Sequence, residues 1–240
     1  MRRHPRRGPE AARLVTTAAA RTEDGPRPDP SPRGAVVGHR IGITLVRSAW
    51  NTRVLGAWRV PGSGPVILAG NHTHNVDGPL VIGTSPRPVH FLVKREAFVG
   101  PAGAAMRVLG QIAVDRGAAD RGAVADTLAV LRAQGVIGMF PEGSRGAGDF
   151  GALRSGLAWF ALRSGAAVVP VAVLGSAERR SRVLPGLPPL RGRLDVVYGE
   201  PFHVGDGSGR RGRAALDAAA EQVQQRLAAH LASARALTAR

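Results

Sequence analysis

The residues whose types and spacing suggest chemistry lie in one short stretch, where His72 precedes Asp77 by five positions. On one continuous helix, that spacing would separate the two side chains by about 140°. A turn between them would instead let the Asp77 carboxylate fold back onto the imidazole. A carboxylate bonded to one ring nitrogen fixes the tautomer and raises the basicity of the other nitrogen. The pair is therefore a candidate general base for a hydroxyl nucleophile.

This stretch alone also supports two other interpretations. A plain hydrogen-bonded turn often brings a histidine close to an aspartate, and it is the more frequent outcome for such a short motif. His72 and His74 together suggest a metal pair. However, the chain has no cysteine and no helical His-x-x-x-His spacing, so we expect no metal site. The choice among a general base, a plain turn and a metal pair depends on which other residues of the chain lie near His72.

The stretch reads as a strand that runs through a turn into a helix. Residues 66–69 are apolar, rich in β-branched side chains and bounded by Pro65 and Gly70, which favours a buried strand over a helix. Pro79 suits the first turn of a new helix, because its missing N–H would have no partner there anyway. His72 is thus expected on the turn and Asp77 at the helix entrance.

Apolar strands and helical stretches then alternate along the chain. A helix-like stretch interrupted by Pro101 and helices at about 121–133 and 153–163 separate several of the strands. This alternation predicts a single α/β domain whose central sheet is largely parallel, with room for mixed pairing, and is flanked by helices. The further strands are expected at 89–93, 111–114, 136–140, 167–174 and 193–198.

The segment that precedes this predicted domain carries a stripe of apolar residues. Val46, Trp50, Val54 and Trp58 recur at every fourth position among several arginines, which predicts a basic amphipathic helix. Such a helix either packs on the core of its own protein or lies in a lipid interface. The predicted organisation is a disordered Arg- and Pro-rich tail at 1–38, this helix at 39–63, the α/β domain at 64–204, and a Gly- and Arg-rich loop with a terminal helix at 205–240.

The composition points to an anionic partner. The chain has 240 residues, of which 44% are apolar, and a net charge of +16. This charge suits nucleic acid or the anionic face of a membrane. Aromatic residues make up only 4% and no nucleic-acid recognition motif appears, so specific nucleic-acid binding is the weaker alternative. The absence of cysteine fits a reducing compartment, and we expect neither a membrane-spanning helix nor a secretory signal.

Polar side chains follow four of the predicted strands. Because ligands of open α/β sheets bind beyond the carboxyl ends of the strands, these side chains are expected to line one pocket. Arginine and lysine among them suit a phosphate, and Gly143 would let the backbone approach a ligand closely. The residues are Asn71, His72 and Asp77, then Lys94, then Asp115 and Arg116, then Glu142, Ser144 and Arg145.

These residues lie in blocks that resemble those of the glycerolipid acyltransferases, the acylglycerol-phosphate acyltransferase family. The match spans about residues 64–204, and its four blocks come in the family's order. Two departures are His74, where the family often has serine, and Arg154, which stands near the place of a family lysine. The blocks are the His-x4-Asp motif of His72 and Asp77, GQIAVDR at 110–116, FPEGSR at 140–145, and VPV at 169–171.

The resemblance implies a glycerol-3-phosphate acyltransferase-like fold and transfer of a fatty acyl group without a cofactor. The donor would be acyl-CoA or acyl carrier protein, and the acceptor a lysophosphatidate-type hydroxyl, which gives phosphatidate in phospholipid biosynthesis. His72 would be the base and Asp77 its partner. Arg116, Glu142, Gly143, Ser144, Arg145 and Lys94 would form the phosphate site, with Asn71 and Arg154 as further candidates.

The same resemblance implies peripheral attachment to the cytoplasmic face of the cell membrane. The substrates of that family are amphiphilic, so the basic helix and the positive charge would hold the enzyme on an anionic leaflet. Three alternatives remain open. They are another lipid or glycolipid acceptor, a hydrolase that activates water with the same pair, and a basic nucleic-acid-binding protein.

Overall fold

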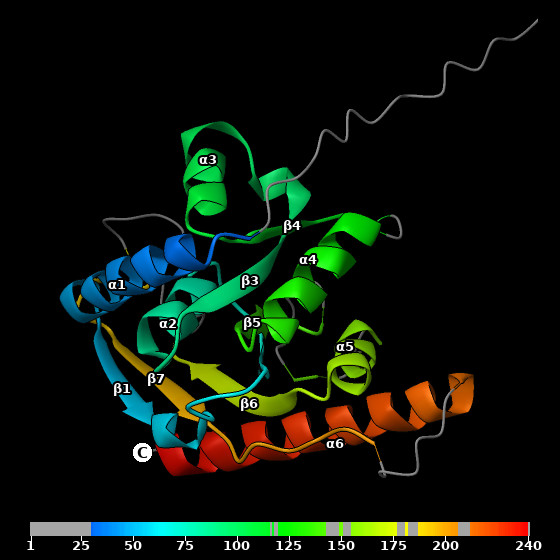
Figure 1. Ribbon diagram of the computed structural model, residues 1–240. Coiled ribbons are helices and arrows are strands. Elements are labelled where there is room, and N and C mark those ends of the chain that lie inside the picture. Colours follow the sequence, from blue (N-terminus) through cyan, green and yellow to red (C-terminus); the bar gives the residue numbers. More distant parts are fainter. Residues whose placement is uncertain are drawn as a thin grey trace, which may run out of the picture.

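Seven strands form one sheet at the centre of the computed structural model, which describes residues 30–115, 117, 120–142, 149–150, 155–176, 181, 187–205 and 212–239 (Figure 1). The strands are β1 (Asn51–Leu55), β2 (Val66–Gly70), β3 (Val89–Lys94), β4 (Ile112–Val114), β5 (Val136–Met139), β6 (Ala167–Leu174) and β7 (Arg193–Tyr198). Their order in the sheet is β1-β7-β6-β2-β5-β3-β4. Neighbouring strands are parallel except β6 and β7, which are antiparallel. The predicted α/β class with a largely parallel, mixed sheet is therefore confirmed.

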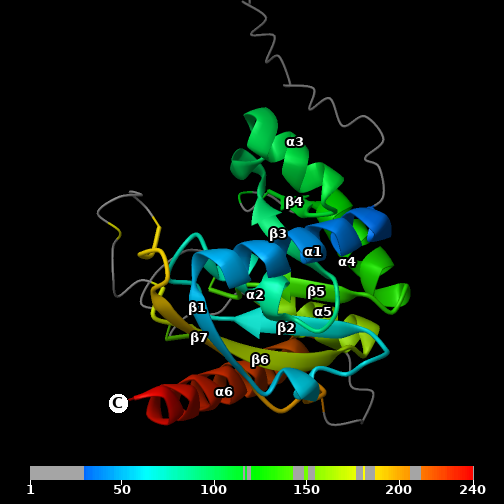
Figure 2. The same ribbon diagram turned by 90° about the vertical axis from the view of Figure 1, so that its left-hand side faces the viewer.

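Helices cover both faces of this sheet (Figures 1 and 2). Residues of α1 and α2 pack in the hydrophobic core on one face, and residues of α4, α5 and α6 pack in the core on the other. The helices are α1 (Pro32–Ala49), α2 (Asp77–Thr84), α3 (Gly100–Val108), α4 (Arg121–Arg132), α5 (Gly156–Ser164) and α6 (Arg213–Thr238), with 3-10 turns at Ala57–Arg59 and Arg95–Ala97.

The strand, turn and helix around the predicted base are present. β2 lies between β5 and β6, and all five of its residues are buried. A strand that is covered on both faces needs apolar side chains at every position, which is why residues 66–69 show no alternation. The chain turns after Gly70 and enters α2 at Asp77, with Pro79 inside the first helical turn. The turn that carries His72 therefore lies at the carboxyl edge of the sheet.

The prediction of one helix over 39–63 is wrong. α1 begins at Pro32, where Ser31 caps it by accepting a hydrogen bond from the Gly34 N–H, and it ends at Ala49. The next residue, Trp50, has an extended backbone (φ −135°, ψ 153°). The chain then continues as β1, which pairs in parallel with β7. Pairing with a strand about 140 residues further along the chain outweighs the local helical spacing.

This change of structure separates the four apolar residues of the predicted stripe. Val46 and Trp50 are buried, at 2% and 6% exposure, whereas Trp58 is 80% exposed on the 3-10 turn after β1. Because β1 belongs to the sheet, the α/β domain begins before residue 64. Most of the predicted disordered tail, residues 1–29, lies outside the described residues.

α1 and α2 cross at two glycines. A Cβ atom added to Gly83 would lie 2.4 Å from the carbonyl oxygen of Gly42, so position 83 needs glycine for the backbones to approach this closely. A Cβ atom at Gly42 would be tight but less so, at 3.0 Å from the Ile82 side chain. His39 adds a side-chain hydrogen bond, because its Nδ1 lies 2.8 Å from the Ile82 carbonyl oxygen. This crossing fixes the position of α1 over the sheet.

The predicted terminal helix packs on the domain itself. Val223, Leu227 and Leu231 of α6 are buried in the core beneath the sheet, at 2% exposure or less. Residues 213–238 therefore belong to the same structural unit as the sheet. Among the described residues, no helix is both long enough and apolar enough to cross a bilayer.

Candidate active site

The predicted contact between His72 and Asp77 is present. The Nδ1 atom of His72 lies 3.2 Å from Oδ2 of Asp77, and the Asp77 side chain is completely buried. His72 follows β2, and Asp77 is the first residue of α2, so the intervening turn folds the carboxylate back onto the ring. About 16% of the His72 side chain remains exposed, which leaves the ring open to a substrate.

The hydrogen bonds of Asp77 determine which nitrogen of His72 carries the proton. Oδ2 also accepts the backbone N–H groups of Thr73 and His74, at 2.8 and 2.7 Å. Oδ1 accepts the hydroxyl of Ser176 at 2.7 Å. A carboxylate engaged by three other donors acts as an acceptor toward the imidazole, so Nδ1 donates and Nε2 keeps its lone pair. That nitrogen can take a proton from a hydroxyl group.

Ser176 belongs to this site and was missed by the sequence analysis. It is completely buried just after β6, and its hydroxyl lies 2.7 Å from Asp77 Oδ1 and 3.2 Å from the Thr73 hydroxyl. A signal for it was available. β6 runs parallel to β2, so a polar residue after β6 lies at the same carboxyl edge as His72.

Phe140 holds the imidazole from one face. Its ring is stacked on that of His72, with 4.1 Å between the centroids and 6° between the planes. Phe91 also packs against the Phe140 ring, with 5.2 Å between the ring centroids. A Cβ at Gly70 would lie 3.0 Å from Phe140, so this glycine leaves room for the aromatic ring. The stacking and the bond to Asp77 together restrict the orientation of His72.

Asn71, a further candidate site residue, is occupied by the sheet. Its side-chain amide donates to the carbonyl oxygen of Val173 at 3.0 Å and accepts the Val173 N–H at 2.8 Å. The residue is 1% exposed. Asn71 thus joins the end of β2 to β6, which positions the turn that carries His72.

Glu142 follows β5 and lies near the same histidine. Burial raises the pKa of its carboxyl group, and the neighbouring Asp149 raises it further, whereas the Phe150 N–H and His72 lower it. Its Oε1 accepts the Phe150 N–H at 2.8 Å. Glu142 therefore ties together the two ends of the segment between residues 142 and 150.

The remaining candidates divide into one described residue and five that are not. Lys94 ends β3 and is exposed at the carboxyl edge of the sheet, since β3 runs parallel to β5 and β5 to β2. The end of β4, at Asp115, lies along the same edge. Outside the described residues lie Arg116, Gly143, Ser144, Arg145 and Arg154.

The fold and the site define a class of protein. A largely parallel α/β sheet carries, at its carboxyl edge, a histidine oriented by a buried aspartate. Such an arrangement is chemically able to activate a hydroxyl group by general base catalysis.

Comparisons with known proteins give the family. The model of the Acyltransferase family matches residues 51–174, which include β1, His72, Asp77 and β6. The chain therefore belongs to the Acyltransferase family and is an O-acyltransferase.

Individual relatives agree with this assignment. The chain is 24% identical over 177 residues to a 1-acyl-sn-glycerol-3-phosphate acyltransferase of Bacillus subtilis, covering 73% of this chain and 85% of the relative. It is 32% identical over 135 residues to a protein of the same name from Borreliella burgdorferi, covering 55% of this chain and 54% of that one. The crystal structure of a 1-acyl-sn-glycerophosphate acyltransferase from Thermotoga maritima has the same fold, with a TM-score of 0.60 and 22% identity. That match covers 86% of this chain and 80% of the other.

Proposed function

We propose that the enzyme transfers a fatty acyl group from a thioester, acyl-CoA or acyl carrier protein, to the free hydroxyl of a lysophosphatidate-type acceptor. The product is phosphatidate, an intermediate of phospholipid biosynthesis. The names of the relatives from Bacillus and Borreliella support this acceptor. The carrying observation is the bond between His72 Nδ1 and buried Asp77, which leaves Nε2 as the base.

The reaction needs no covalent acyl-enzyme. His72 Nε2 removes the proton of the acceptor hydroxyl while the oxygen attacks the thioester carbonyl. The tetrahedral intermediate then collapses, the carbon–sulfur bond breaks, and the leaving thiolate takes the proton back from the imidazolium. Asp77 stabilises the transient positive charge on the ring. One proton and one acyl group are exchanged, and no other reactant is consumed.

The acceptor phosphate is proposed to bind along the carboxyl edge of the sheet. Arg116 follows β4 and Arg145 follows β5, and Lys94 ends β3 at that edge. Arginine binds phosphate through two parallel hydrogen bonds and lysine as a point charge. Glu142 accepts the Phe150 N–H, and we propose that it thereby organises the segment that follows β5. Gly143 and Ser144 in that segment would offer the phosphate backbone and hydroxyl contacts.

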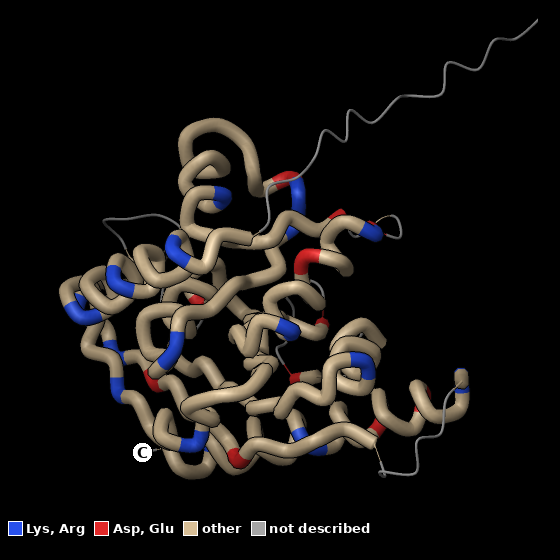
Figure 3. The backbone as a smooth tube through the Cα atoms, viewed as in Figure 1, with Lys and Arg blue, Asp and Glu red and all other residues tan. Residues whose placement is uncertain are grey.

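We further propose that the outer face of α1 holds the enzyme on the cytoplasmic leaflet. Val37, Ile41 and Leu45 follow one another at four-residue spacing and are 50%, 52% and 44% exposed. Arg33 and Arg40 lie on the same exposed side, and Figure 3 shows basic positions spaced along this helix. Exposed apolar residues beside arginines suit an anionic lipid interface. Trp50, which the sequence analysis assigned to this contact, is buried and takes no part.

An acyl-transfer assay tests the chemistry. Purified enzyme is incubated with labelled acyl-CoA or acylated carrier protein and with lysophosphatidate, other lysolipids or a glycolipid. We expect phosphatidate, and a decrease in rate of about 10²–10⁴-fold in His72→Ala. His203→Ala is the matched control, because His203 is exposed and remote from the pair. Free fatty acid as the sole product would instead favour hydrolysis, and full activity of His72→Ala would reject the mechanism.

Vesicle binding tests the membrane contact. Replacement of Val37, Ile41 and Leu45 by serine is expected to weaken binding to anionic vesicles, and added salt is expected to weaken it further. Leu237→Ser is the control, since Leu237 is 62% exposed on α6. Equal binding of the triple variant and the control would refute this surface.

A further inference from the structure

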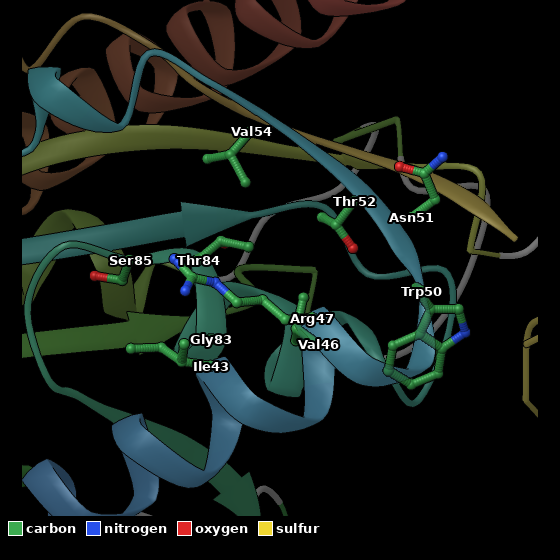
Figure 4. A pocket seen from close by; sticks show the side chains of 10 residues that line it. All are labelled: Ile43, Val46, Arg47, Trp50, Asn51, Thr52, Val54, Gly83, Thr84 and Ser85. Atoms are coloured by element: carbon green, nitrogen blue, oxygen red, sulfur yellow. The ribbon is translucent and has the colours of Figure 1, made fainter. Parts of the chain in front are cut away.

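A second concave site lies between α1, β1 and the last turn of α2. It has a volume of about 550 Å³ and is drawn in Figure 4. Pockets of ~300–1,000 Å³ are typical of small-molecule sites. Gly83 and Thr84 of α2 border it, whereas Asp77 begins the same helix. Six residues of helix rise by about 9 Å, so this pocket is separate from the contact between Asp77 and His72.

Apolar side chains form one part of the wall of this pocket, and polar side chains form the rest. Val46 and Trp50 from α1 and its end, with Val54 from β1, line it. The Trp50 indole is held in place, because its Nε1 lies 3.5 Å from the carbonyl oxygen of Pro188. These side chains offer a rigid surface to a hydrocarbon chain.

One cation extends through the pocket. Figure 4 shows the Arg47 side chain running from α1 toward Thr84, with its guanidinium group on the α2 side. No ion pair joins Arg47 to any acidic residue in the part of the chain that the structure describes. By contrast, Arg53 and Arg59 on the same edge of the sheet are paired with Asp195 and Glu200. The charge of Arg47 is thus available to an anionic ligand.

Thr52 supplies an unused hydroxyl group in the same pocket. Its Oγ1 is buried and has no hydrogen-bond partner among the residues that the structure describes, and Figure 4 shows it on the side of the strand that faces Arg47. A buried hydroxyl without a partner destabilises the folded state, so such groups are rare. An anionic group held by Arg47 would give this hydroxyl an acceptor, which none of the described residues supplies.

We propose that this pocket binds a single-chain anionic amphiphile. The hydrocarbon chain lies against Val46, Trp50 and Val54, and the anionic group accepts hydrogen bonds from Arg47 and the Thr52 hydroxyl. A lipid phosphate and a fatty-acid carboxylate both have this chemistry. The site goes beyond the proposed function, because it lies apart from His72 and its occupant is not required to be a substrate.

Fluorescence of Trp50 gives a direct test. The chain has three tryptophans, so Trp58→Phe and Trp159→Phe leave Trp50 as the one reporter. Bromododecyl phosphate is titrated below its micelle concentration, since bromine quenches only a nearby indole. This probe has no hydroxyl that could accept an acyl group. We expect saturable quenching, whereas the uncharged bromododecanol quenches weakly.

Two variants test the polar contacts in this reporter background. Arg47→Gln is expected to weaken binding of the phosphate probe about tenfold or more, as expected for a lost charged hydrogen bond. Thr52→Val is expected to weaken it several-fold while the Tm stays equal or rises, because the Thr52 hydroxyl has no hydrogen bond to any described residue that could be lost. A merely structural threonine would show the opposite Tm change. Bromododecanoate in place of the phosphate probe distinguishes a carboxylate site from a phosphate site.

Each control makes the same kind of substitution at a residue that does not line the pocket. Arg132→Gln removes an arginine from the last turn of α4, as Arg47→Gln does from α1, and Thr44→Val removes an exposed hydroxyl of α1. Both should bind the probe like the parent. Absence of saturable quenching, or equal affinity of Arg47→Gln and Arg132→Gln, would overturn the proposal.

The binding experiment can fail or succeed independently of the acyl-transfer assay. If lysophosphatidate is not acylated but the probe still quenches Trp50 in an Arg47-dependent way, the proposed function fails and the pocket stands. If phosphatidate forms but Arg47→Gln binds the probe normally, the pocket proposal fails and the function stands.

Discussion

Ser176 donates a hydrogen bond to Asp77 Oδ1 over 2.7 Å, although 99 positions separate the two residues in the chain. The bond joins the end of β6 to the start of α2, beside the Asn71 amide that ties β2 to β6. The aspartate that orients His72 is thus held by a neighbouring strand as well as by its own turn. The base is built on the rigid part of the fold.

Ser176→Ala is expected to lower both stability and turnover. The buried Oδ1 of Asp77 would lose its donor, which costs about 1–3 kcal/mol of the free energy of unfolding. The carboxylate would also be less firmly oriented toward His72. We expect kcat to fall about tenfold, equivalent to ~1.4 kcal/mol, with a smaller change in KM. Chemical denaturation and steady-state kinetics measure these effects, and Ser233→Ala, an exposed serine of α6, is the control. Unchanged kcat would show that Ser176 does not position the base.

Phe140→Leu tests the stacking on His72. Leucine keeps an apolar side chain against Phe91 but offers no flat face to the imidazole. An aromatic pair contributes about 0.5–1.5 kcal/mol beyond its buried area, so we expect kcat to fall by roughly two- to tenfold. The Tm should fall modestly, because leucine has three fewer side-chain carbons and leaves part of the space beside Phe91 unfilled. A large loss of Tm with unchanged kcat would mean that Phe140 only fills the core.

Gly83→Ala tests the crossing of α1 and α2. The added methyl group would lie 2.4 Å from the Gly42 carbonyl oxygen, so α1 must move away from the sheet. We expect a loss of about 1–3 kcal/mol in the free energy of unfolding, as for overpacked cores. Gly156→Ala, in the first turn of α5, meets no atom within 4 Å and should be neutral or slightly stabilising. Equal stabilities of the two variants in urea would contradict the close crossing.

Two histidines make the stability depend on pH. Burial lowers the pKa of His90 and of His230 below the usual 6.5, although the carbonyl groups that they contact raise it in part. The unfolded chain then binds more protons than the folded one, so the free energy of unfolding falls as pH drops below about 6.5. Above pH 7 both histidines are neutral in both states, and their contribution is constant. Urea titrations between pH 5 and 8 measure this slope.

His230→Gln isolates one of these contributions. The variant should lose less stability than the parent as pH falls, by at most about 1.4 kcal/mol per pH unit. Glu142, whose raised pKa gives a slope of the opposite sign, is common to both chains and cancels in the difference. His203→Gln, which changes an exposed histidine, should follow the parent. Parallel curves for parent and His230→Gln would contradict the lowered pKa.

The strands around the site were predictable because their signals are local. Residues 66–69 and 167–174 are continuous apolar runs with many β-branched side chains, and they form β2 and β6. The contact of His72 with Asp77 was also predictable, since a turn of known length joins them. The helix predicted at 39–63 failed because Val46, Trp50, Val54 and Trp58 imitate helical spacing. The partner that makes residues 51–55 a strand is β7, far along the chain.

The sequence by itself therefore determined the strand, turn and helix that carry His72, the α/β class, and the kinds of side chain that follow each strand. These depend on periodicity, β-branching and proline, which act within a few residues. Only the tertiary structure decided that Ser176 and Phe140 contact the base, and that α1 and β1 enclose a pocket with Arg47 and Thr52. Such contacts join distant segments, and their geometry depends on the order of strands in the sheet and on how closely the helices cross above it.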